Sequence, residues 1–372
     1  MGRGGGGRSR GRDGLVDIAA GAPVRLDRRR PQALLADLVH GERARGVCIA
    51  AGGAGAPVRR AGAHERRTRA HAAPRDGERV VTLAVTRVLA PNPSAATLEG
   101  TNTWIVGEGP TIVIDPGPAI DEHLEEVARA AGRVAHVLVT HDHEDHAAGA
   151  VTFARLVGAN VTAWRLPEAA KLRDGQGFAA GGVELIAMHT PGHSADHVVF
   201  SDAGSGALFT GDAVLGRGTS FIDAPDGDLA KYLASLRRML EREPRTIYPG
   251  HGSVVLDAKA KLREYLDHRA ERESQILAGL AAGDRTVDDL VERIYAEHPP
   301  DVQELAARSV TAHLLKLETE GRAAKAGPAA ERTWTIVEPK ACARCGRPVK
   351  GRARYCGSCS LALLQGDAAG SA

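Results

Sequence analysis

Short apolar runs and amphipathic stretches alternate along the chain from about residue 80 onward. Alternating or uniformly apolar runs predict strands, because successive side chains of a strand face opposite sides of a sheet. Apolar residues spaced three or four apart predict helices at 120–131 and 147–157. The predicted strands are VVTLAVTRVLA, NTWIVG, TIVID, AHVLVT, VELIAMH, HVVFS and ALFTG. Strands that alternate with helices in this way predict an α/β protein with helices packed on sheets.

Further helices are predicted toward the C-terminus, the first of them directly after Asp228, a residue type that caps helices. Its apolar residues share one face: Leu229, Tyr232, Leu233, Leu236 and Leu240. Three more stretches follow, HRAERESQILAGL, TVDDLVERIY opened by Thr286, and VQELAARSVTAHLLKLETEGR ending at Gly321. The strand-like ERTWTIVEP comes next. Three helices and a strand or hairpin are typical of a winged helix, and a plain three-helix cap fits the same pattern.

The first 80 residues have a different character, with 17 Arg, no Lys, 8 acidic residues and no sustained hydrophobic period. We therefore expect residues 1–79 to form a disordered Arg/Gly-rich extension. An arm that binds nucleic-acid phosphates is one interpretation, and a linker or upstream extension is the favoured one. Cys48 is assigned no role.

The composition excludes several classes of protein. With 43% hydrophobic and 3% aromatic residues, the chain is neither collagen-like nor wholly disordered. Its longest uncharged stretch, 46–58, has 13 residues, whereas a membrane-spanning helix needs about 20 apolar ones. Residues 15–24 are too polar at Asp17 for a secretory signal. We expect a cytoplasmic protein without a membrane segment.

Histidine and aspartate side chains gather in turns that follow apolar runs. THDHEDH comes directly after the strand AHVLVT, and TPGH, FTGD and PGHG each place one such residue in a glycine-containing turn. The side chains are His141, His143, Asp145, His146, His193, Asp212 and His251. Strand ends of this kind gather at one rim of a fold, and His and Asp suit a borderline ion such as zinc. Seven ligands exceed one tetrahedral ion, so the pattern predicts two adjacent metals with one bridging carboxylate.

THDHEDH, TPGH, TGD and PGHG at these separations resemble the metallo-β-lactamase superfamily of hydrolases, over about residues 81–266. The resemblance implies a four-layer αβ/βα sandwich with a dinuclear site at one edge. Carried over by position, it implies one metal held by His141, His143 and His193, another held by Asp145, His146 and His251, and Asp212 as the bridge.

Two zinc ions in such a site would make hydroxide available from a bridging water at neutral pH, and manganese or iron would also fit His and Asp ligands. Asp145, which would orient that hydroxide, and Asp212 are the predicted catalytic residues. Asp115 in IDPG is either a support for the ligands or a turn-capping residue.

Individual positions narrow the reaction. His143 stands where the redox di-iron relatives are expected to carry a carboxylate, which favours hydrolysis over oxygen chemistry. Asp212 stands where many zinc β-lactamases place Cys, which disfavours an antibiotic-degrading role. Only 39 positions separate Asp212 from His251, too few for the insertion of the processing nucleases.

A metal domain followed by a winged-helix-like segment resembles the beta-lactamase-like protein 2 family, whose members are metal-dependent endoribonucleases of single-stranded RNA. The substrate implied is therefore single-stranded RNA, although 25 basic against 37 acidic residues in 81–338 argue against strong non-specific phosphate binding. A thioesterase or lactonase of the hydroxyacylglutathione hydrolase type is the competing enzyme hypothesis. A non-catalytic nucleic-acid-binding regulator is the competing hypothesis outside the enzymes.

Two CxxC pairs near the C-terminus predict a small zinc ribbon with one structural zinc. The four cysteines are Cys342, Cys345, Cys356 and Cys359. Two disulfides are the alternative, and a reducing compartment disfavours them. The predicted domains are thus the extension 1–79, the hydrolase domain 80–266, the winged-helix-like domain 267–338 and the ribbon with its tail 339–372.

Overall fold

Two β-sheets pack face to face in the computed structural model, which describes residues 83–328, 332–337, 340–341, 343–345 and 348–349. The strand order is β1-β2-β3-β4-β5-β6 in the first sheet and β11-β10-β9-β8-β7 in the second. The first sheet contains β1 (Val85–Leu89), β2 (Asn102–Val106), β3 (Thr111–Ile114), β4 (Val134–Leu138), β5 (Val161–Ala163) and β6 (Ala170–Lys171). The second contains β7 (Gly177–Ala180), β8 (Val183–His189), β9 (Val198–Asp202), β10 (Ala207–Gly211) and β11 (Thr246–Pro249). Buried side chains of both sheets form one apolar cluster, in which Trp104 meets Phe209 edge to face.

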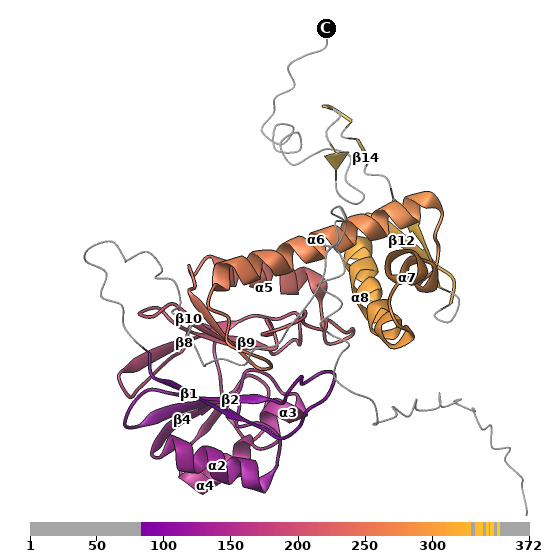
Figure 1. The fold of residues 1–372 in the computed structure, drawn as a ribbon. Coiled ribbons are helices and arrows are strands. Elements are labelled where there is room, and N and C mark those ends of the chain that lie inside the picture. Colours follow the sequence, from indigo (N-terminus) through magenta and orange to yellow (C-terminus); the bar gives the residue numbers. More distant parts are fainter. Residues whose placement is uncertain (1–82, 329–331, 338–339, 342, 346–347, 350–372) are drawn as a thin grey trace, which may run out of the picture. The chain divides into compact units, whose positions relative to one another are not determined.

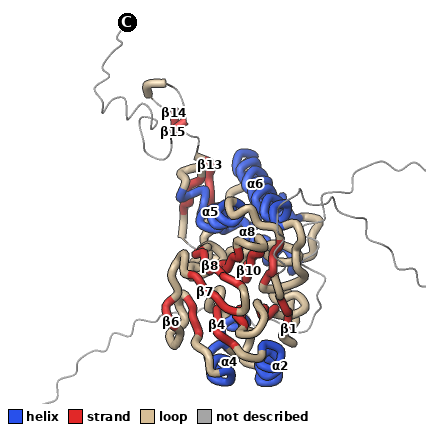
Figure 2. The backbone as a smooth tube through the Cα atoms, turned by 90° about the vertical axis from the view of Figure 1, so that its left-hand side faces the viewer, coloured by secondary structure: helices blue, strands red, loops and turns tan. Residues whose placement is uncertain are grey.

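Helices cover the outer face of each sheet (Figures 1 and 2). On the first sheet, α2 (Asp121–Ala131) and α4 (Ala150–Val157) bury side chains such as Leu124 and Phe153 against the strands. On the second sheet, α5 (Leu229–Leu240) and α6 (Ala258–Ala282) bury Leu236 and Leu262 in a separate cluster. The order helix, sheet, sheet, helix confirms the predicted four-layer αβ/βα architecture.

Parallel strand pairs bring the ends of several strands to one edge. β3 and β4 run parallel with Ile114 opposite Leu138, and β10 and β11 run parallel with Gly211 opposite Pro249. Because parallel neighbours end on the same side, the segments after β3 and β4 emerge together, and so do the segments after β10 and β11. These segments carry most of the His and Asp side chains that the sequence motifs contain.

The helix predicted at 147–157 is shorter than expected. Only α4 is found there, preceded by the single turn α3 (Glu144–Ala147). Gly149 separates the two, and a β-carbon at this position would lie within 2.9 Å of Leu124 and of the carbonyl oxygens of Gly117 and Pro118. Tertiary contact at this glycine therefore sets the helix start, which the hydrophobic period alone does not reveal.

A second, smaller core follows the two-sheet part of the chain. The end of α6 packs with α7 (Val287–Tyr295), α8 (Pro300–Thr319) and the antiparallel hairpin of β12 (Ala323–Ala326) and β13 (Thr333–Ile336). Thr286 caps α7 as predicted: its hydroxyl oxygen accepts from the Asp289 amide, and the Asp289 carboxylate accepts from the Thr286 amide. Three helices and a hairpin form the winged helix that the sequence predicts. The predicted domain boundary at 266/267 falls inside α6, which is one continuous helix of 25 residues.

The remaining predictions fall largely outside the described residues. The extension 1–79 lies there, as do Cys342, Cys356 and Cys359 of the predicted ribbon. Cys345 lies in an exposed turn between the two-residue strands β14 (Lys340–Ala341) and β15 (Pro348–Val349), which pair antiparallel. Among the helices of the described ranges, none has the length and apolar character needed to cross a membrane.

Candidate metal centre

Four of the predicted ligands form a first group, whose ligand atoms all lie within 4.8 Å of one another. His141 Nε2 lies 3.0 Å from His143 Nδ1, which lies 3.2 Å from His193 Nε2. Asp212 Oδ2 lies 3.8 Å from His193 Nε2. Three nitrogens and a carboxylate oxygen at these separations are the donor set of a tetrahedral site for zinc or a similar ion.

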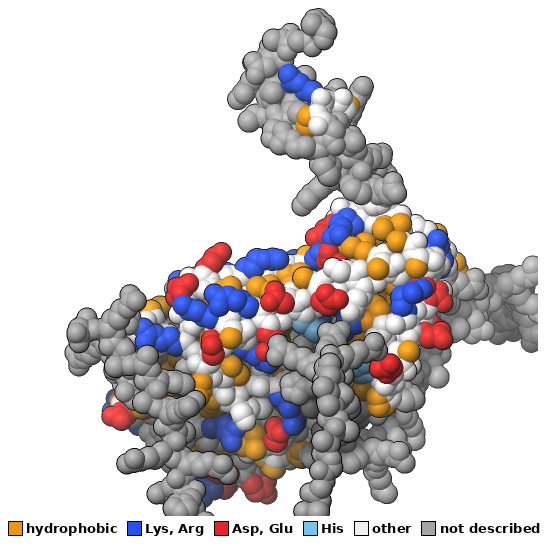
Figure 3. All heavy atoms as spheres, turned by 45° about the horizontal axis from the view of Figure 1, so that its top comes forward, with side chains coloured by type: hydrophobic (Ala, Val, Ile, Leu, Met, Phe, Trp, Pro, Cys, Tyr) orange, Lys and Arg blue, Asp and Glu red, His pale blue; other side chains and the backbone are white. Residues whose placement is uncertain are grey.

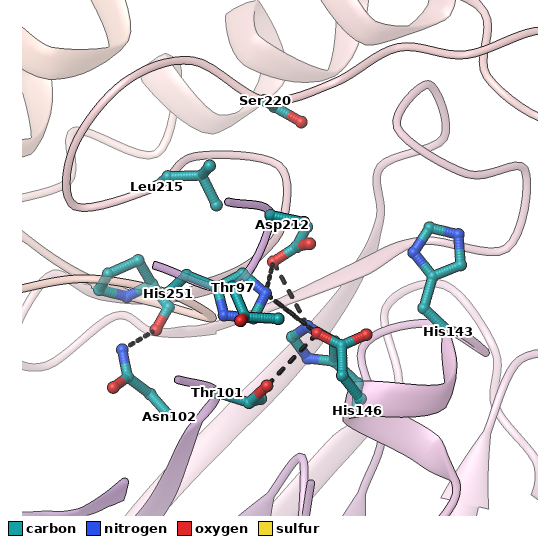
Figure 4. A network of polar contacts seen from close by, with 12 residues as sticks. Thr97, Thr101, Asn102, His143, His146, Asp212, Leu215, Ser220 and His251 are labelled. Atoms are coloured by element: carbon teal, nitrogen blue, oxygen red, sulfur yellow. Dashed lines mark hydrogen bonds and ion pairs between the residues drawn. The ribbon is translucent and has the colours of Figure 1, made fainter. Parts of the chain in front are cut away.

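Asp145, His146 and His251 form a second group beside the first. Asp145 Oδ2 lies 3.2 Å from His251 Nε2 and 3.5 Å from His146 Nε2. The other oxygen of Asp212, Oδ1, lies 3.3 and 3.4 Å from the same two nitrogens (Figure 4). Asp212 thus presents one oxygen to each group, so the structure brings all seven predicted side chains together in the predicted division.

Loops at the ends of strands position these seven side chains. His141 and His143 follow β4, and α3 then carries Asp145 and His146. His193 lies between β8 and β9, while Asp212 directly follows β10 and His251 follows β11. The first sheet therefore supplies four of the seven side chains and the second sheet three.

Asp115 supports one histidine of each group. Its Oδ2 accepts the hydroxyl proton of Thr140 at 2.8 Å and lies 2.9 Å from His146 Nδ1. Because the Thr140 hydroxyl donates to Asp115, it is left to accept from His141 Nδ1, 2.9 Å away. Asp115 is buried and holds a left-handed backbone with φ of 50°. Of the two roles considered for it, the contacts match the support of ligands.

Backbone carbonyls hold two further rings. His193 Nδ1 lies 2.8 Å from the Phe221 carbonyl oxygen, and His251 Nδ1 lies 3.1 Å from that of Gly100. A carbonyl can only accept, so these nitrogens carry the proton and the Nε2 lone pairs point into the cluster. His141 and His146 are held instead by the Thr140 hydroxyl and the Asp115 carboxylate, so in all four rings Nδ1 is engaged outside the cluster and Nε2 faces into it.

The electrostatics of the cluster favour a bound cation. Although burial opposes it, His251 and His146 hold the pKa of Asp212 well below its usual range. Burial likewise opposes the shift at His146, yet Asp212, Asp145 and Asp115 raise its pKa well above the usual value. Among the described residues, no donor forms a hydrogen bond with the buried Asp212 Oδ1, and the Nε2 atoms of His146 and His251 face each other at 3.3 Å. Ionised carboxylates and converging lone pairs fit metal ions better than they fit protons.

Sequence reasoning missed several residues around this cluster. His197 is fully buried, and its ring centroid lies 5.1 Å from that of His141. Burial is the main cause that lowers its pKa well below the usual value, so it packs behind the site as a neutral ring. Thr101 donates to Asp145 at 3.3 Å, and the Asn102 amide donates to the Pro249 carbonyl just before His251. The spacing of His197 four residues after His193 was a signal, whereas nothing local marked Thr101 or Asn102.

Exposure differs among the seven side chains and shows where the site opens. His143 is exposed, whereas His141, His146 and His251 are buried and the others are partly covered. In Figure 4, His143 stands apart from Asp212 and His251, on the far side from Asn102. The cluster is therefore most open on the side of His143.

Comparison with known proteins agrees with this geometry. The chain matches the family described as the metallo-beta-lactamase superfamily at residues 96–163 and 160–251, and the beta-lactamase associated winged helix domain at 286–334. It is 33% identical over 285 residues to a beta-lactamase-like protein 2 homolog of Drosophila melanogaster, covering 70% of this chain and 96% of that protein. It is 37% identical over 275 residues to an atrochrysone carboxyl ACP thioesterase of Claviceps purpurea, covering 69% of this chain and 87% of that protein.

The fold has a counterpart among solved structures. A beta-lactamase domain protein of Burkholderia ambifaria superposes with a TM-score of 0.60 at 18% identity, covering 68% of this chain and 91% of its own. At this identity the similarity shows only a shared fold, and it supports the four-layer sandwich.

Proposed function

The chain belongs to the metallo-β-lactamase superfamily and is a metal-dependent hydrolase, and we propose that its seven clustered side chains bind two metal ions and hydrolyse substrate beside them. One observation carries the proposal: Asp212 directs one carboxylate oxygen to each group of ligand atoms. Membership of a hydrolase superfamily sets aside the interpretation as a non-catalytic regulator. Zinc is the proposed metal, because nitrogen-rich donor sets with few carboxylates suit it.

When bound, two such ions would make hydroxide available from water at neutral pH and polarise the group under attack. The protein supplies the geometry. His141, His143 and His193 fix the first set of donors, while Asp145, His146 and His251 fix the second. Asp145 keeps its Oδ2 engaged with Thr101 and His251, which holds its carboxylate at the edge of the cluster, and burial notwithstanding, His146 lowers its pKa to about 2. An ionised Asp145 in this place accepts a proton or orients a water molecule, which is the catalytic role proposed for it.

Single-stranded RNA is the proposed substrate. The winged helix follows the hydrolase domain directly, in the order of the beta-lactamase-like protein 2 relatives. On the face seen in Figure 3, the coloured Lys and Arg side chains are mixed with Asp and Glu. A mixed surface favours contacts local to the metal site over tight non-specific binding, so we expect weak, salt-sensitive association and cleavage at the side of His143.

An acyl thioester is the second candidate substrate, because a relative named as an ACP thioesterase is 37% identical to this chain. The same arrangement of ligands serves either reaction, since both need a nucleophilic water and a stabilised oxyanion. A carrier-bound thioester would also approach at the exposed side of His143.

A side-by-side assay of the purified full chain decides between these substrates. We expect the zinc-loaded protein to cut a labelled single-stranded RNA internally and to leave double-stranded RNA intact. His143→Ala should abolish cutting, because it removes a ligand atom at the open side of the site. Efficient hydrolysis of a thioester with intact RNA would establish the second candidate, and RNA cutting that persists in His143→Ala would identify a contaminating nuclease.

We also propose the domain boundaries predicted from the sequence and the C-terminal zinc ribbon. We expect about three zinc ions per chain, two at the His/Asp cluster and one at Cys342, Cys345, Cys356 and Cys359. Elemental analysis should find two ions fewer when the ligands of the cluster are replaced, and one fewer when the cysteines are.

A further inference from the structure

The loop that follows Asp212 is held by side chains of α6, the helix that continues into the winged helix. This loop, residues 213–222, connects the end of β10 to the segment before α5. Tyr265 of α6 accepts a hydrogen bond from the Leu215 amide at 3.0 Å and donates one to the Gly218 carbonyl at 2.9 Å. One helical turn further, Arg269 donates to the Ser220 carbonyl at 2.6 Å.

The far end of the loop touches a ligand of the first group. Ser220 Oγ lies 3.3 Å from His193 Nδ1, and the next carbonyl, that of Phe221, accepts from the same nitrogen at 2.8 Å. Figure 4 shows Leu215 and Ser220 on the chain that passes beside Asp212. By fixing the Ser220 carbonyl, Arg269 fixes the peptide plane that leads to the carbonyl holding His193.

Arg269 also contacts the winged helix. Its Nη1 lies 3.2 Å from Ser309 Oγ on α8, so one guanidinium joins α8 to the loop. The guanidinium also lies 5.7 Å from the ring centre of Tyr232, whose hydroxyl donates to the carbonyl of Ala213, the residue after Asp212. Through these contacts α8, the loop and His193 form one connected series.

The burial of Arg269 is unfavourable for the stability of the fold. Its side chain is 3% exposed, Nε is buried without a partner, and its hydrogen-bond acceptors among the described residues are a carbonyl and a hydroxyl. A buried charge without a carboxylate partner costs more than an apolar side chain of similar volume. Packing alone does not explain an arginine at this position. Its hydrogen bonds, which fix the geometry of the loop, do explain it.

We propose that Arg269 is a positioning residue that couples the winged helix to the affinity of the first ligand group for its metal, by holding the peptide at Ser220 and thereby the ring of His193. The inference rests on the proposed metal centre. It adds that the C-terminal domain acts on the site without contributing a ligand.

Cobalt(II) titration of the full chain in a His251→Ala background tests the proposal, because that change disables the second group and leaves the first. Cobalt absorption distinguishes ligation by nitrogen and oxygen from ligation by cysteine sulfur. We expect Arg269→Met to weaken binding at the first group about 10-fold, the scale found for residues that orient ligands. Arg269→Lys should restore part of the affinity, since an ammonium can reach the Ser220 carbonyl but not Ser309 as well.

Two further variants separate positioning from loss of packing. Arg308→Ala removes an exposed ion pair between α8 and Asp223 without touching Ser220, and it should leave cobalt affinity unchanged. Ser309→Ala keeps Arg269 and should weaken cobalt binding less than Arg269→Met does. If the methionine variant does not fold, Ser309→Ala still tests the proposal.

Equal cobalt affinity in wild type, Arg269→Met and Ser309→Ala would overturn the proposal. So would an equal loss in Arg308→Ala. Failure of the His251→Ala parent and of the wild type to bind cobalt at the His/Asp cluster would instead overturn the proposed metal centre itself, and this inference with it.

Discussion

Asp115 shows how one buried carboxylate organises two half-sites. It accepts hydrogen bonds from the Thr140 amide and hydroxyl, and it holds His146 directly and His141 through Thr140. A single side chain thereby fixes the tautomer of one ring in each ligand group. Ring orientation is as important for metal affinity as the ligands themselves, because a misplaced lone pair binds poorly.

Asp115→Asn should therefore weaken both metals. An amide nitrogen in place of Oδ2 cannot accept from the Thr140 hydroxyl or from His146 Nδ1, and one in place of Oδ1 faces the donating Thr140 amide, so either orientation disrupts the support of the rings. We expect a 10- to 100-fold loss of affinity, measured by competition with a chromophoric chelator. Asp121→Asn, at an exposed position of α2, serves as the control for loss of a carboxylate. Unchanged affinity at both groups would show that Asp115 only caps its turn.

His313 introduces a pH dependence of a different kind. It is fully buried in α8, and neither ring nitrogen has a hydrogen-bond partner within the part of the chain that the structure describes. Burial first, then the charge of Arg269, lowers its pKa well below 6.5, and burial with Arg269 lowers that of His268 to about 4. In the unfolded chain both histidines titrate near 6.5. Between pH 6.5 and 4 the unfolded state therefore binds protons that the folded state does not bind, so the free energy of unfolding falls as the pH falls.

His313→Leu should flatten this dependence. Each such histidine contributes a slope of up to about 1.4 kcal/mol per pH unit, and the variant removes one of them. Urea unfolding of wild type and variant at several pH values measures the two slopes. The curves should run parallel above pH 7, where the histidine is neutral in both states, and diverge below pH 6.5. Parallel curves over the whole range would mean that His313 is protonated or solvated in the folded protein.

At the scale of helices and strands, the sequence predicted what local chemistry determines. Asp228 caps α5 by accepting from the Lys231 amide, and Thr286 caps α7, both as predicted. The start of α4 and the continuity of α6 were not predicted. The helix α4 begins after Gly149 because of the close contact of that residue with residues 117–118, and α6 continues because its two halves pack in different cores. Both causes are tertiary contacts, which cannot be inferred from the hydrophobic periodicity of the sequence.

Gly192 ties a helix to a ligand and gives a prediction at this scale. A β-carbon there would lie 2.3 Å from Tyr232 Cα in α5, and the backbone φ is +142°. Gly192→Ala should therefore push α5 away from the residue that precedes His193, with a cost of about 1–3 kcal/mol and weaker metal binding at the first group. Gly132→Ala is the matched control, since φ is also positive there but no atom lies within 4 Å of the added carbon. If both variants lost the same stability and the same metal affinity, backbone strain alone would explain the effect of Gly192→Ala, and the contact with α5 would not contribute.

At the scale of the whole molecule, the ligand set follows from topology. Spacing and glycine turns pointed to the seven side chains that the structure brings together, because each follows an apolar run that ends at the same edge. The residues that orient them were not predictable in the same way. Thr101, Thr140 and Ser220 come from separate segments, and their side chains are of common types that serve many roles. Only the folded arrangement shows which of them face the cluster.

A chain beginning at Val80 should fold and bind metal normally. The four apolar clusters of the described residues draw on side chains between Leu83 and Trp334, so the truncation removes none of them. The Arg/Gly-rich composition of 1–79 predicts no core of its own. Thermal unfolding and metal titration of the shortened chain check this expectation, and a large drop in either would assign the extension a structural role.

Removal of metal should lower the stability of the whole sandwich. Four of the proposed ligands follow strands of the first sheet and three follow strands of the second, so bound ions would join the two layers at the edge where their core ends. A ligand that binds only the folded state stabilises it by about 4 kcal/mol when its free concentration is a thousand times Kd. The unfolding temperature should therefore fall on adding a chelator and rise with free zinc. Asp212→Ala should respond far less, because it loses the carboxylate that serves both groups. A wild-type unfolding temperature that is independent of metal would mean that the cluster is not loaded in the folded protein.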